Sequence, residues 1–440
     1  MAPIDPRMSR IGGGMFRFNL MELGGALGDL GTLLPLTAAL ISLNHMNATG
    51  VFFVIGLAYM AAGLFYRLPV PVQPLKAVAA IAIAGGLSAS VISASGLVMA
   101  AFLLLLAGTG AIGWVARLFP RAIIRGIQLG VGLLLVKAGL ALVNRRQPIA
   151  GVEESFSLAN LSIPTNWLLA LALGGFLLLF LRSRKLPAFL AVLSLGGLAS
   201  ILWGSAAGLR SLHLGLSLPG VAMPSLGDLS ATLTLLVIPQ IPLTLGNAVF
   251  ATVDTARAYF GPRAKRVTPR ALLTTMGVAN LGAGLLGGIP ICHGSGGLTA
   301  HFRLGARTGG ASLMIGALFL ALALFLDGNV FPILALIPYP VLGVLVAFVG
   351  VQHSLLVREL RGRGQISVAL VVAILGLVTT NLAIGLASGM CLYFILRALA
   401  GSRRVSLLTY RSKEDGLVTS EEANDTLPGE RVPDARGFGH

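Results

Sequence analysis

The chain has 440 residues, of which 55% are hydrophobic and only 11% are charged, and its formal net charge is +16. Soluble domains carry about 25% charged residues, so this composition excludes an ordinary soluble domain and is typical of a protein embedded in a lipid bilayer. The two cysteines, Cys292 and Cys391, are too few for a disulfide framework.

Apolar runs recur along the chain, and most are close to the about 20 residues that a helix needs to cross roughly 30 Å of hydrocarbon. They predict an all-α polytopic membrane protein. The first run contains Glu22 and Asp29 and has no convincing small-residue cleavage site, which indicates a retained span and not a signal peptide. The runs lie at residues 20–40, 51–66, 97–115, 123–142, 167–181, 311–326, 341–351 and 368–382.

The basic residues gather in short clusters between the apolar runs, such as 117–125, 257–270 and 358–363. The alternate connections, such as 42–50 and 85–96, contain no Lys or Arg. Basic loops stay on the cytoplasmic side of a membrane, so this alternation predicts a multi-pass protein of the cell (inner) membrane with both termini in the cytoplasm. The same distribution accounts for the net charge without a nucleic-acid partner.

Two motifs interrupt the third predicted crossing of each half of the chain with residues that do not suit a helix. The first is PVPVQPLKA at residues 69–77, and the second is GIPICHGSGG at residues 288–297. Proline lacks an N–H donor and favours extended geometry in the residue before it, so each motif predicts an extended segment followed by a half-helix. Broken segments at matching positions of two inverted halves indicate an inverted-repeat transporter whose site lies near the midplane of the bilayer.

The traced crossings predict two inverted repeats with flanking polar segments. We expect a cytoplasmic N-terminal segment (1–18), a first repeat of seven crossings (19–203), an extracytoplasmic connection (204–230), a second repeat (231–400) and a disordered cytoplasmic tail (401–440). The tail is too short for a regulatory domain, so we expect none there.

Each half-helix N-terminus offers free backbone N–H groups and about half a positive charge, so the two breaks predict a site for an anion. Glycines let the backbone approach a ligand closely, and His293 is placed to donate an N–H at the mouth of its half-helix. Cys292 and His293 are only two adjacent ligands, which is a weak zinc signal, so no metal is expected. The substrate-binding candidates in the two motifs are Gln73, Pro74, Leu75, Lys76, His293, Gly294, Ser295, Gly296 and Gly297.

Lys76, Glu22 and Asp29 are charged residues inside predicted spans. A charge inside a membrane costs roughly 2.5–3.5 kcal/mol on insertion scales, so each is a candidate functional residue. A lysine beside a helix N-terminus requires a negative neighbour, which is either a bound anion or one of the two carboxylates in a structural ion pair. Glu22 and Asp29 are also candidates for carrying a proton that offsets an incoming dianion.

The opening span of the second half carries Gln240, Thr244 and Asn247 at helical spacing on one face. These side chains either hydrogen-bond an oxyanion or bond across neighbouring helices, which is the commoner use. We find no nucleophile–base motif, phosphate loop or dinucleotide fingerprint in the sequence. This disfavours an integral membrane enzyme and an ATP-driven pump, and no cofactor is expected.

Four separated motifs of the chain resemble the molybdate transporter type 1 family, whose relatives are the SulP anion transporters. The resemblance extends from about Phe16 to Leu396. The motifs are FNLMELGGALGDLGTLLPL, PVPVQPLKAVAAIA, IPQIPLTLGNAVFAT and PICHGSGGLTAHFRLGARTG.

The resemblance implies seven plus seven inverted spans, a core domain that moves against a gate domain, and a site between the third and tenth spans. It also implies secondary active, proton-coupled uptake of a tetrahedral oxyanion, molybdate or sulfate, by a chain without a STAS domain. Relatives suggest a homodimer. The alternatives within the same fold are a bicarbonate or a nucleobase carrier.

Overall fold

The computed structural model describes residues 16–145, 155–158, 161–180, 188–202, 209–210, 212–326, 331–334 and 336–401. Most of these residues are helical, which confirms the predicted all-α class. Seven of the described helices are long and apolar enough to cross a membrane, and five shorter apolar helices accompany them. The predicted N-terminal segment and C-terminal tail lie almost entirely outside the described residues.

The helices and strands divide between the two halves of the chain. The elements of the first half are α1 (Leu20–Ala26), η2 (Leu27–Asp29), α2 (Leu30–Asn44), α3 (Ala48–Tyr66), β1 (Gln73–Pro74), α4 (Lys76–Gly85), α5 (Ala89–Thr109), α6 (Ile112–Arg117), α7 (Arg121–Asn144), β2 (Ser155–Leu158), β3 (Leu161–Pro164), α8 (Thr165–Phe180) and α9 (Ala188–Leu202). The elements of the second half are α10 (Leu226–Thr232), η4 (Leu233–Val237), α11 (Ile238–Leu243), η5 (Thr244–Phe250), α12 (Ala251–Phe260), η6 (Gly261–Arg266), α13 (Pro269–Leu285), β4 (Ile291–Cys292), α14 (Ser295–Arg303), α15 (Gly309–Phe325), α16 (Phe331–Leu334), α17 (Tyr339–Ser354), η7 (Leu355–Glu359), α18 (Arg363–Val378) and α19 (Leu382–Gly401).

Two helices begin inside segments that the sequence predicts to be connections, and polar N-caps explain both. α5 begins within 85–96 because the Ser88 side chain accepts a hydrogen bond in its first turn. α10 begins within 204–230 because Ser225 and Asp228 form a capping box. A serine oxygen satisfies one of the free N–H groups of the first turn, so a helix starts where composition alone indicates a loop.

The packing of the helices repeats between the halves, as an inverted repeat requires. α3 is the second span of the first half and packs on α15, the fourth span of the second half. In the same way, α13 is the second span of the second half and packs on α5, the fourth span of the first half. α7 and α17 occupy matching positions and pack on each other. The two broken crossings, β1–α4 and β4–α14, also match. The arrangement confirms the predicted inverted-repeat fold.

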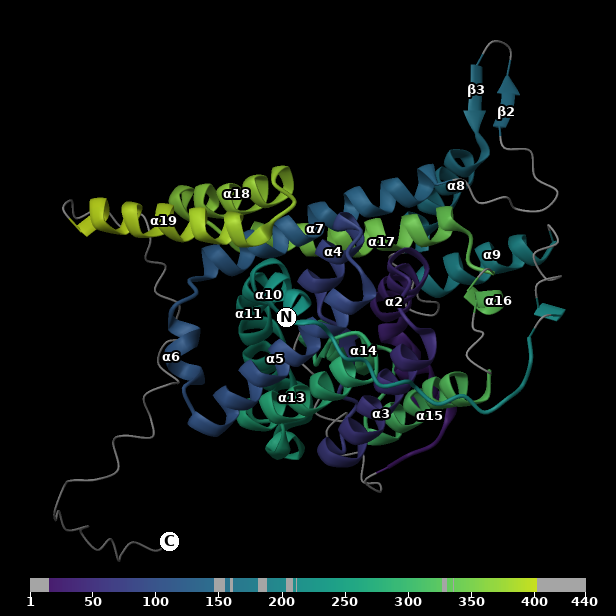
Figure 1. The fold of residues 1–440 in the computed structure, drawn as a ribbon, viewed down its shortest axis with the longest axis horizontal. Helices are drawn as coiled ribbons and strands as arrows, with labels where there is room; N and C mark the ends of the chain where they lie inside the picture. The colour runs from purple at the N-terminus through teal and green to yellow at the C-terminus, as the bar shows by residue number, and fades with distance from the viewer. Residues whose placement is uncertain are drawn as a thin grey trace, which may run out of the picture.

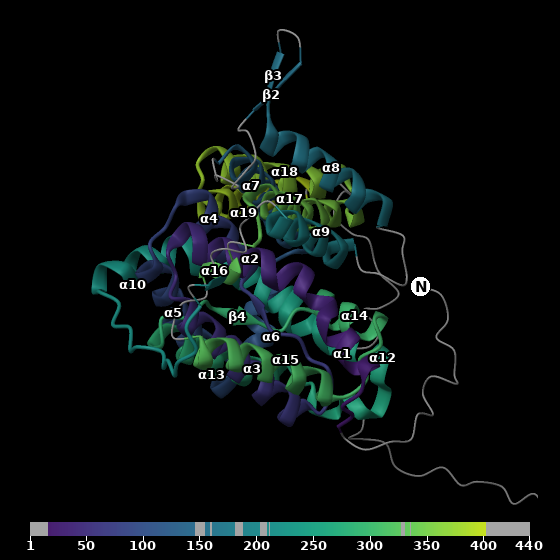
Figure 2. The same ribbon diagram turned by 90° about the vertical axis from the view of Figure 1, so that its right-hand side faces the viewer.

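The helices form two layers that correspond to the expected core and gate domains. Figure 1 shows α7, α17, α18 and α19 running across the top of the molecule, above α2, α5, α13 and α15, and Figure 2 shows the same separation from the side. The layers touch where α4 and α11 pack on α7 and where α2 packs on α17. The broken crossings lie in the lower layer, and their half-helix α4 contacts the upper one.

The helix pair α7–α17 holds the upper layer together through close backbone contact. A side-chain carbon added to Gly139 would lie 2.5 Å from the carbonyl oxygen of Gly343, and one added to Gly350 would lie 2.5 Å from that of Gly132. Within a membrane no hydrophobic driving force brings helices together, so their association depends on close packing. Small residues allow this because they let the two backbones approach. The upper layer is therefore built around a tight glycine-lined contact.

The broken crossings meet in a two-stranded antiparallel pairing at the centre of the lower layer. β1 pairs with β4, with Gln73 opposite Cys292 and Pro74 opposite Ile291. α4 and α14 begin directly after these strands, so the pairing brings the N-termini of two half-helices together. This confirms the predicted extended segments and half-helices.

Candidate anion-binding site between the half-helices

The extended segment before α4 is held by side chains, because its prolines prevent a normal strand ladder. The carbonyl of Pro69 accepts a hydrogen bond from His301 Nδ1 at 2.9 Å, and that of Pro71 accepts one from His293 Nδ1 at 2.8 Å. Ser312 Oγ donates to the carbonyl between them at 3.1 Å. Irregular backbone at membrane depth needs such internal partners, and here each carbonyl has one.

The extended segment before α14 has an equivalent support. Asn280 Oδ1 accepts a hydrogen bond from the backbone N–H of Ile291 at 2.8 Å, and its Nδ2 donates to the carbonyl of the same residue at 2.9 Å. Leu75 N donates to the carbonyl of Pro290 at 2.9 Å, which joins the two segments. Thr252 Oγ1 donates to the carbonyl of His293 at 2.8 Å. These hydrogen bonds within the protein hold the backbone of both breaks in place.

A chain of polar side chains lies at the N-terminus of α4. Lys76 Nζ donates to Gln73 Oε1 at 2.6 Å, and Gln73 Nε2 donates in turn to Asp29 Oδ1. All three side chains are buried, and Asp29 Oδ2 has no hydrogen-bond partner among the described residues. Lys76 therefore reaches Asp29 through Gln73, and the direct ion pair considered from the sequence does not form.

The N-terminus of α14 is open and built from small residues. Gly294 is its N-cap, and Ser295 Oγ donates to Asn247 Oδ1 at 2.8 Å. Among the described residues, none accepts a hydrogen bond from the backbone N–H of Ser295, Gly296 or Gly297. A carbon added to Gly296 would have no atom within 4 Å, whereas one added to Gly297 would lie 2.7 Å from Asp29 Oδ1.

The two N-termini meet at Gly294. A side-chain carbon placed on this residue would lie 3.3 Å from Lys76 Nζ and would also collide with Gln73. The ammonium of α4 is thus beside the first turn of α14, where the helix dipole is also positive. Two positive features at one place, beside the carboxylate of Asp29, make a site suited to an anion with more than one negative charge.

The helix that begins the second repeat contacts both N-termini. Gln240 Oε1 accepts a hydrogen bond from Ala77 N of α4 at 2.8 Å, and its Nε2 donates to Thr244 Oγ1 at 3.0 Å. Asn247, further along, binds the Ser295 hydroxyl of α14. The π-helical segments η4 and η5 flank the proline-containing α11, which is consistent with π-bulges at functional sites.

Several predicted site residues lie at this place in a supporting role. Pro74 has no N–H, and Leu75 N–H is used by Pro290, so both residues shape the backbone and offer no donor to a ligand. His293, expected to donate to a ligand, has both ring nitrogens engaged, with Pro71 and with Thr275 Oγ1 at 3.1 Å. It holds the extended segment from behind.

Glu22 lies away from the half-helix N-termini. Its carboxylate accepts hydrogen bonds from the backbone N–H groups of Arg307 at 3.0 Å and Thr308 at 3.2 Å, just before α15 begins. It does not pair with Lys76. Of the two candidate proton carriers, only Asp29 contacts the polar chain at α4.

Sequence reasoning missed the residues that support the extended segments: His301, Ser312, Asn280 and Thr252. Each is buried and polar within an apolar region, which is the signal that could have drawn attention to them. Their partners could not be inferred, because the hydrogen bonds join residues up to 242 positions apart. Within the described ranges, no group of three or more His, Cys, Asp or Glu residues could hold a metal ion.

The two layers and the facing half-helices define a class: a multi-pass inverted-repeat membrane carrier. The fold is similar to the transmembrane domain of the cyanobacterial bicarbonate transporter BicA, with a TM-score of 0.58 and 20% sequence identity over 83% of this chain and 96% of that structure. The likeness establishes the fold.

The chain belongs to the family described as "Molybdate transporter of MFS superfamily", which matches residues 21–135 and 232–352, together more than half of the chain. It is 29% identical over 439 residues to Molybdate transporter 2 of Arabidopsis thaliana, covering 91% of this chain and 92% of that relative. It is also 29% identical over 293 residues to a probable sulfate transporter of Mycobacterium tuberculosis, covering 62% of this chain and 50% of that relative. The family points to a carrier and not to an enzyme.

Proposed function

We propose that the protein is a secondary active transporter that carries molybdate, or the similarly tetrahedral dianion sulfate, across the membrane by alternating access. The observation that carries this proposal is the meeting of two half-helix N-termini, with Lys76 on one and unpaired backbone N–H groups on the other. Membership of the molybdate transporter family and the names of the relatives support the class of substrate.

Binding uses donors from both half-helices. The oxygens of a tetrahedral dianion accept hydrogen bonds from the N–H groups of Gly296 and its neighbours in the first turn of α14. Lys76 exchanges its neutral partner Gln73 for the anion, which is a stronger acceptor because its negative charge attracts the ammonium directly. The anion then moves with the lower layer past the upper layer, because both half-helices belong to the lower layer.

Proton coupling follows from the polar chain at α4. When Lys76 turns to the anion, its hydrogen bond to Gln73 breaks. Asp29 then no longer interacts with the ammonium through Gln73. A carboxylate left in this buried place is costly, and protonation removes the cost. Asp29 Oδ2 and the neighbouring buried hydroxyl of Tyr59 both lack a hydrogen-bond partner among the described residues, so Oδ2 is available to take that proton. One proton then enters with each dianion.

The orientation and location follow the charge distribution. Basic clusters on alternate connections support a location in the inner membrane of the cell with both termini in the cytoplasm. We also propose that the protein forms a homodimer, as the family resemblance implies. Cysteine labelling in intact cells tests the orientation: single cysteines introduced at 257–270 should resist an impermeant reagent, and a cysteine at 45 should react.

The experiment that tests the function measures ligand binding to the purified full-length protein and uptake into proteoliposomes. Molybdate, tungstate and sulfate are compared with bicarbonate and uracil. We expect binding of the tetrahedral oxyanions and uptake that increases with an inward proton gradient. Binding of bicarbonate or uracil without any binding of the three oxyanions would contradict the proposal.

A further inference from the structure

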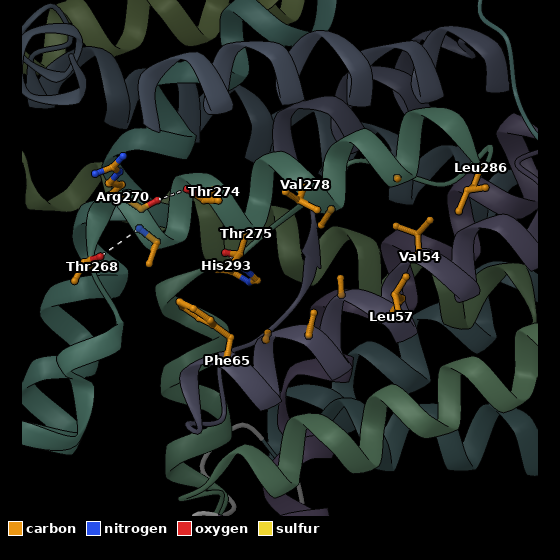
Figure 3. Close-up of a pocket in the computed structure, with 16 residues that line it drawn as sticks. Val54, Leu57, Phe65, Thr268, Arg270, Thr274, Thr275, Val278, Leu286 and His293 are labelled. Carbon is orange, nitrogen blue, oxygen red and sulfur yellow. Dashed lines mark hydrogen bonds between the residues drawn. The ribbon is translucent and has the colours of Figure 1, made fainter. Parts of the chain in front are cut away.

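A groove between α3 and α13 lies in the lower layer and reaches His293, the residue that precedes the N-cap of α14. Its volume is about 680 Å³, within the roughly 300–1,000 Å³ that ligand pockets occupy. Figure 3 shows Val54 and Leu286 at one end of the groove and Thr268 and Arg270 at the other, with His293 at its floor. Of the residues that line it, His293 and its partner Thr275 support the extended segment before α4, and the proposed transport mechanism gives the others no role.

The walls of the groove are apolar and accessible. Leu57, Phe65 and Val278 are 51%, 44% and 58% exposed, although they belong to membrane-spanning helices. The remaining lining along the walls is mostly alanine and glycine, which leaves a hollow between the two helices. Large apolar side chains exposed at this depth face lipid chains, so the occupant has to be apolar over most of its length.

The length of the groove matches one leaflet of a bilayer. Along α3 the lining runs from Val54 to Phe65, which is roughly 16 Å at a rise of about 1.5 Å per residue. Half of a hydrocarbon core about 30 Å thick is close to that value. An acyl chain that enters at one membrane surface can lie in the groove along the whole of its leaflet.

The end of the groove at Phe65 carries positive charge. Arg270 lines the groove, and among the described residues none forms an ion pair with it. Arg266 Nη1 donates to the carbonyl of Phe65 at 2.8 Å, which fixes a second cation at this end. Arg263 and Lys265 lie in the adjoining η6. Four basic residues beside a membrane span are typical of a site for an anionic lipid headgroup.

We propose that this groove binds one acyl chain of an anionic phospholipid whose phosphate is held by Arg270 and Arg266. The apolar walls take the chain, and the basic end selects the charge of the headgroup. The proposal concerns a site different from the anion site and does not depend on which substrate the protein carries.

The bound acyl chain stabilises the side chains that support the extended segment before α4. His293 and Thr275 line the groove and hydrogen-bond each other, and His293 also holds Pro71 in the extended segment before α4. An acyl chain packed on these two side chains excludes water from both hydrogen bonds. The lipid therefore raises the thermal stability of the lower layer without touching the transported anion.

The test uses the full-length protein, delipidated in detergent, with phosphatidylglycerol or phosphatidylcholine of the same acyl chains added back. Thermal unfolding and native mass spectrometry measure stabilisation and lipid binding. We expect phosphatidylglycerol to bind more tightly and to raise the unfolding temperature further. Arg270→Gln should weaken its binding about fivefold, as expected for the loss of one basic contact at a membrane surface, and should leave phosphatidylcholine unaffected.

Two pairs of variants separate this site from general lipid effects. Gly282→Phe introduces a ring into the groove at a residue where an added first side-chain carbon meets no atom within 4 Å, and it should remove the most tightly bound lipid. Gly108→Phe is the matched control, because Gly108 is an equally open glycine on α5. Arg117→Gln, in the separate basic cluster at α6, is the control for Arg270→Gln and should behave as wild type.

Three outcomes would overturn the proposal. The first is equal stabilisation of the wild type by the two lipids. The second is an unchanged preference for phosphatidylglycerol in Arg270→Gln, or the same loss in the control Arg117→Gln. The third is a change of oligomeric state in Gly282→Phe with lipid binding intact, which would make this face an interface between copies of the chain. A loss of phosphatidylglycerol binding in Gly282→Phe with retained oxyanion binding would support it.

Discussion

At the N-terminus of α4, side chains fill the space around the first turn: Lys76 binds Gln73, and Gln240 takes the N–H of Ala77. At the N-terminus of α14 the first turn consists of small residues, and Gly296 has open space where its side chain would be. The two half-helices share one backbone arrangement and differ in chemistry. In the proposed mechanism α4 contributes a cation, Lys76, and α14 contributes backbone donors.

The difference shows how an inverted repeat makes an asymmetric site. A symmetric site with two lysines would hold a dianion tightly and release it slowly. A site with two bare glycine turns would lack the charge to draw the anion from water. In the proposed mechanism the single cation returns to Gln73 when the anion leaves, and through Gln73 it again interacts with the carboxylate of Asp29.

The largest effect should come from closing the open turn with Gly296→Val. The valine meets no protein atom within 4 Å of its first carbon, so the fold should keep its unfolding temperature. It fills the space in front of the N–H groups, each worth roughly 1.5–3 kcal/mol to an anion, and should weaken molybdate binding about 100-fold or more. Gly108→Val, an open glycine on α5, is the control in the same calorimetric titration. Wild-type affinity in Gly296→Val would show that the anion binds elsewhere.

Removing the cation from the other half-helix should cost less. Lys76→Met loses one charge-assisted hydrogen bond of roughly 1.5–3 kcal/mol, so molybdate affinity should fall about 10- to 150-fold. Lys137→Met removes an exposed lysine of α7 in the upper layer and should leave the affinity unchanged. An equal loss in both variants would mean that Lys76 acts only through the overall charge of the protein.

Substitution of the two buried carboxylates, Asp29 and Glu22, should affect the pH dependence of uptake differently. If Asp29 takes the proton, uptake by the wild type rises as the external pH falls, and Asp29→Asn should lose this dependence. Glu22→Gln should keep the pH profile and instead lower the free energy of unfolding by about 1–2 kcal/mol, because two backbone N–H groups lose a charged acceptor. Uptake into proteoliposomes across a pH series checks both. A lost pH profile in Glu22→Gln alone would assign the proton to Glu22.

The smallest effects should come from the helix that contacts both N-termini. Gln240→Ala leaves the N–H of Ala77 without its acceptor and should weaken molybdate binding about 2- to 13-fold, the equivalent of roughly 0.5–1.5 kcal/mol. Asn247→Ala removes only the acceptor of a serine hydroxyl, which can rotate to another partner, and should stay at the lower end of that range. Titration of both variants would rank them, and a larger loss in Asn247→Ala would contradict the assigned roles.

Much of this architecture could be predicted because it depends on local residue chemistry. The prolines of 69–77 and the glycines of 288–297 break a helix wherever they occur, so the two interrupted crossings were evident from the sequence. Lys76 also stood out, because a lysine inside a span is costly. The positions of Gln240 and Asn247 on one helix face followed from helical spacing.

The long-range pairings could not be predicted. The sequence indicates that Lys76 needs a negative neighbour, but only the fold inserts Gln73 between it and Asp29. His293 has the chemistry of a ligand donor, yet the fold turns both of its ring nitrogens to Pro71 and Thr275. A polar residue in an apolar chain indicates that a hydrogen-bond partner exists, but only the tertiary structure shows which residue that partner is.

The most direct test of the central claim is a structure of the protein with molybdate, in which the anomalous scattering of molybdenum locates the anion. The asymmetric site predicts one strong peak between the first turn of α14 and Lys76, with oxyanion oxygens within hydrogen-bond distance of Gly296 N and Lys76 Nζ. It also predicts that Nζ moves from Gln73 to the anion. A peak at the basic loops, or one at the half-helices with Lys76 still bound to Gln73, would contradict it.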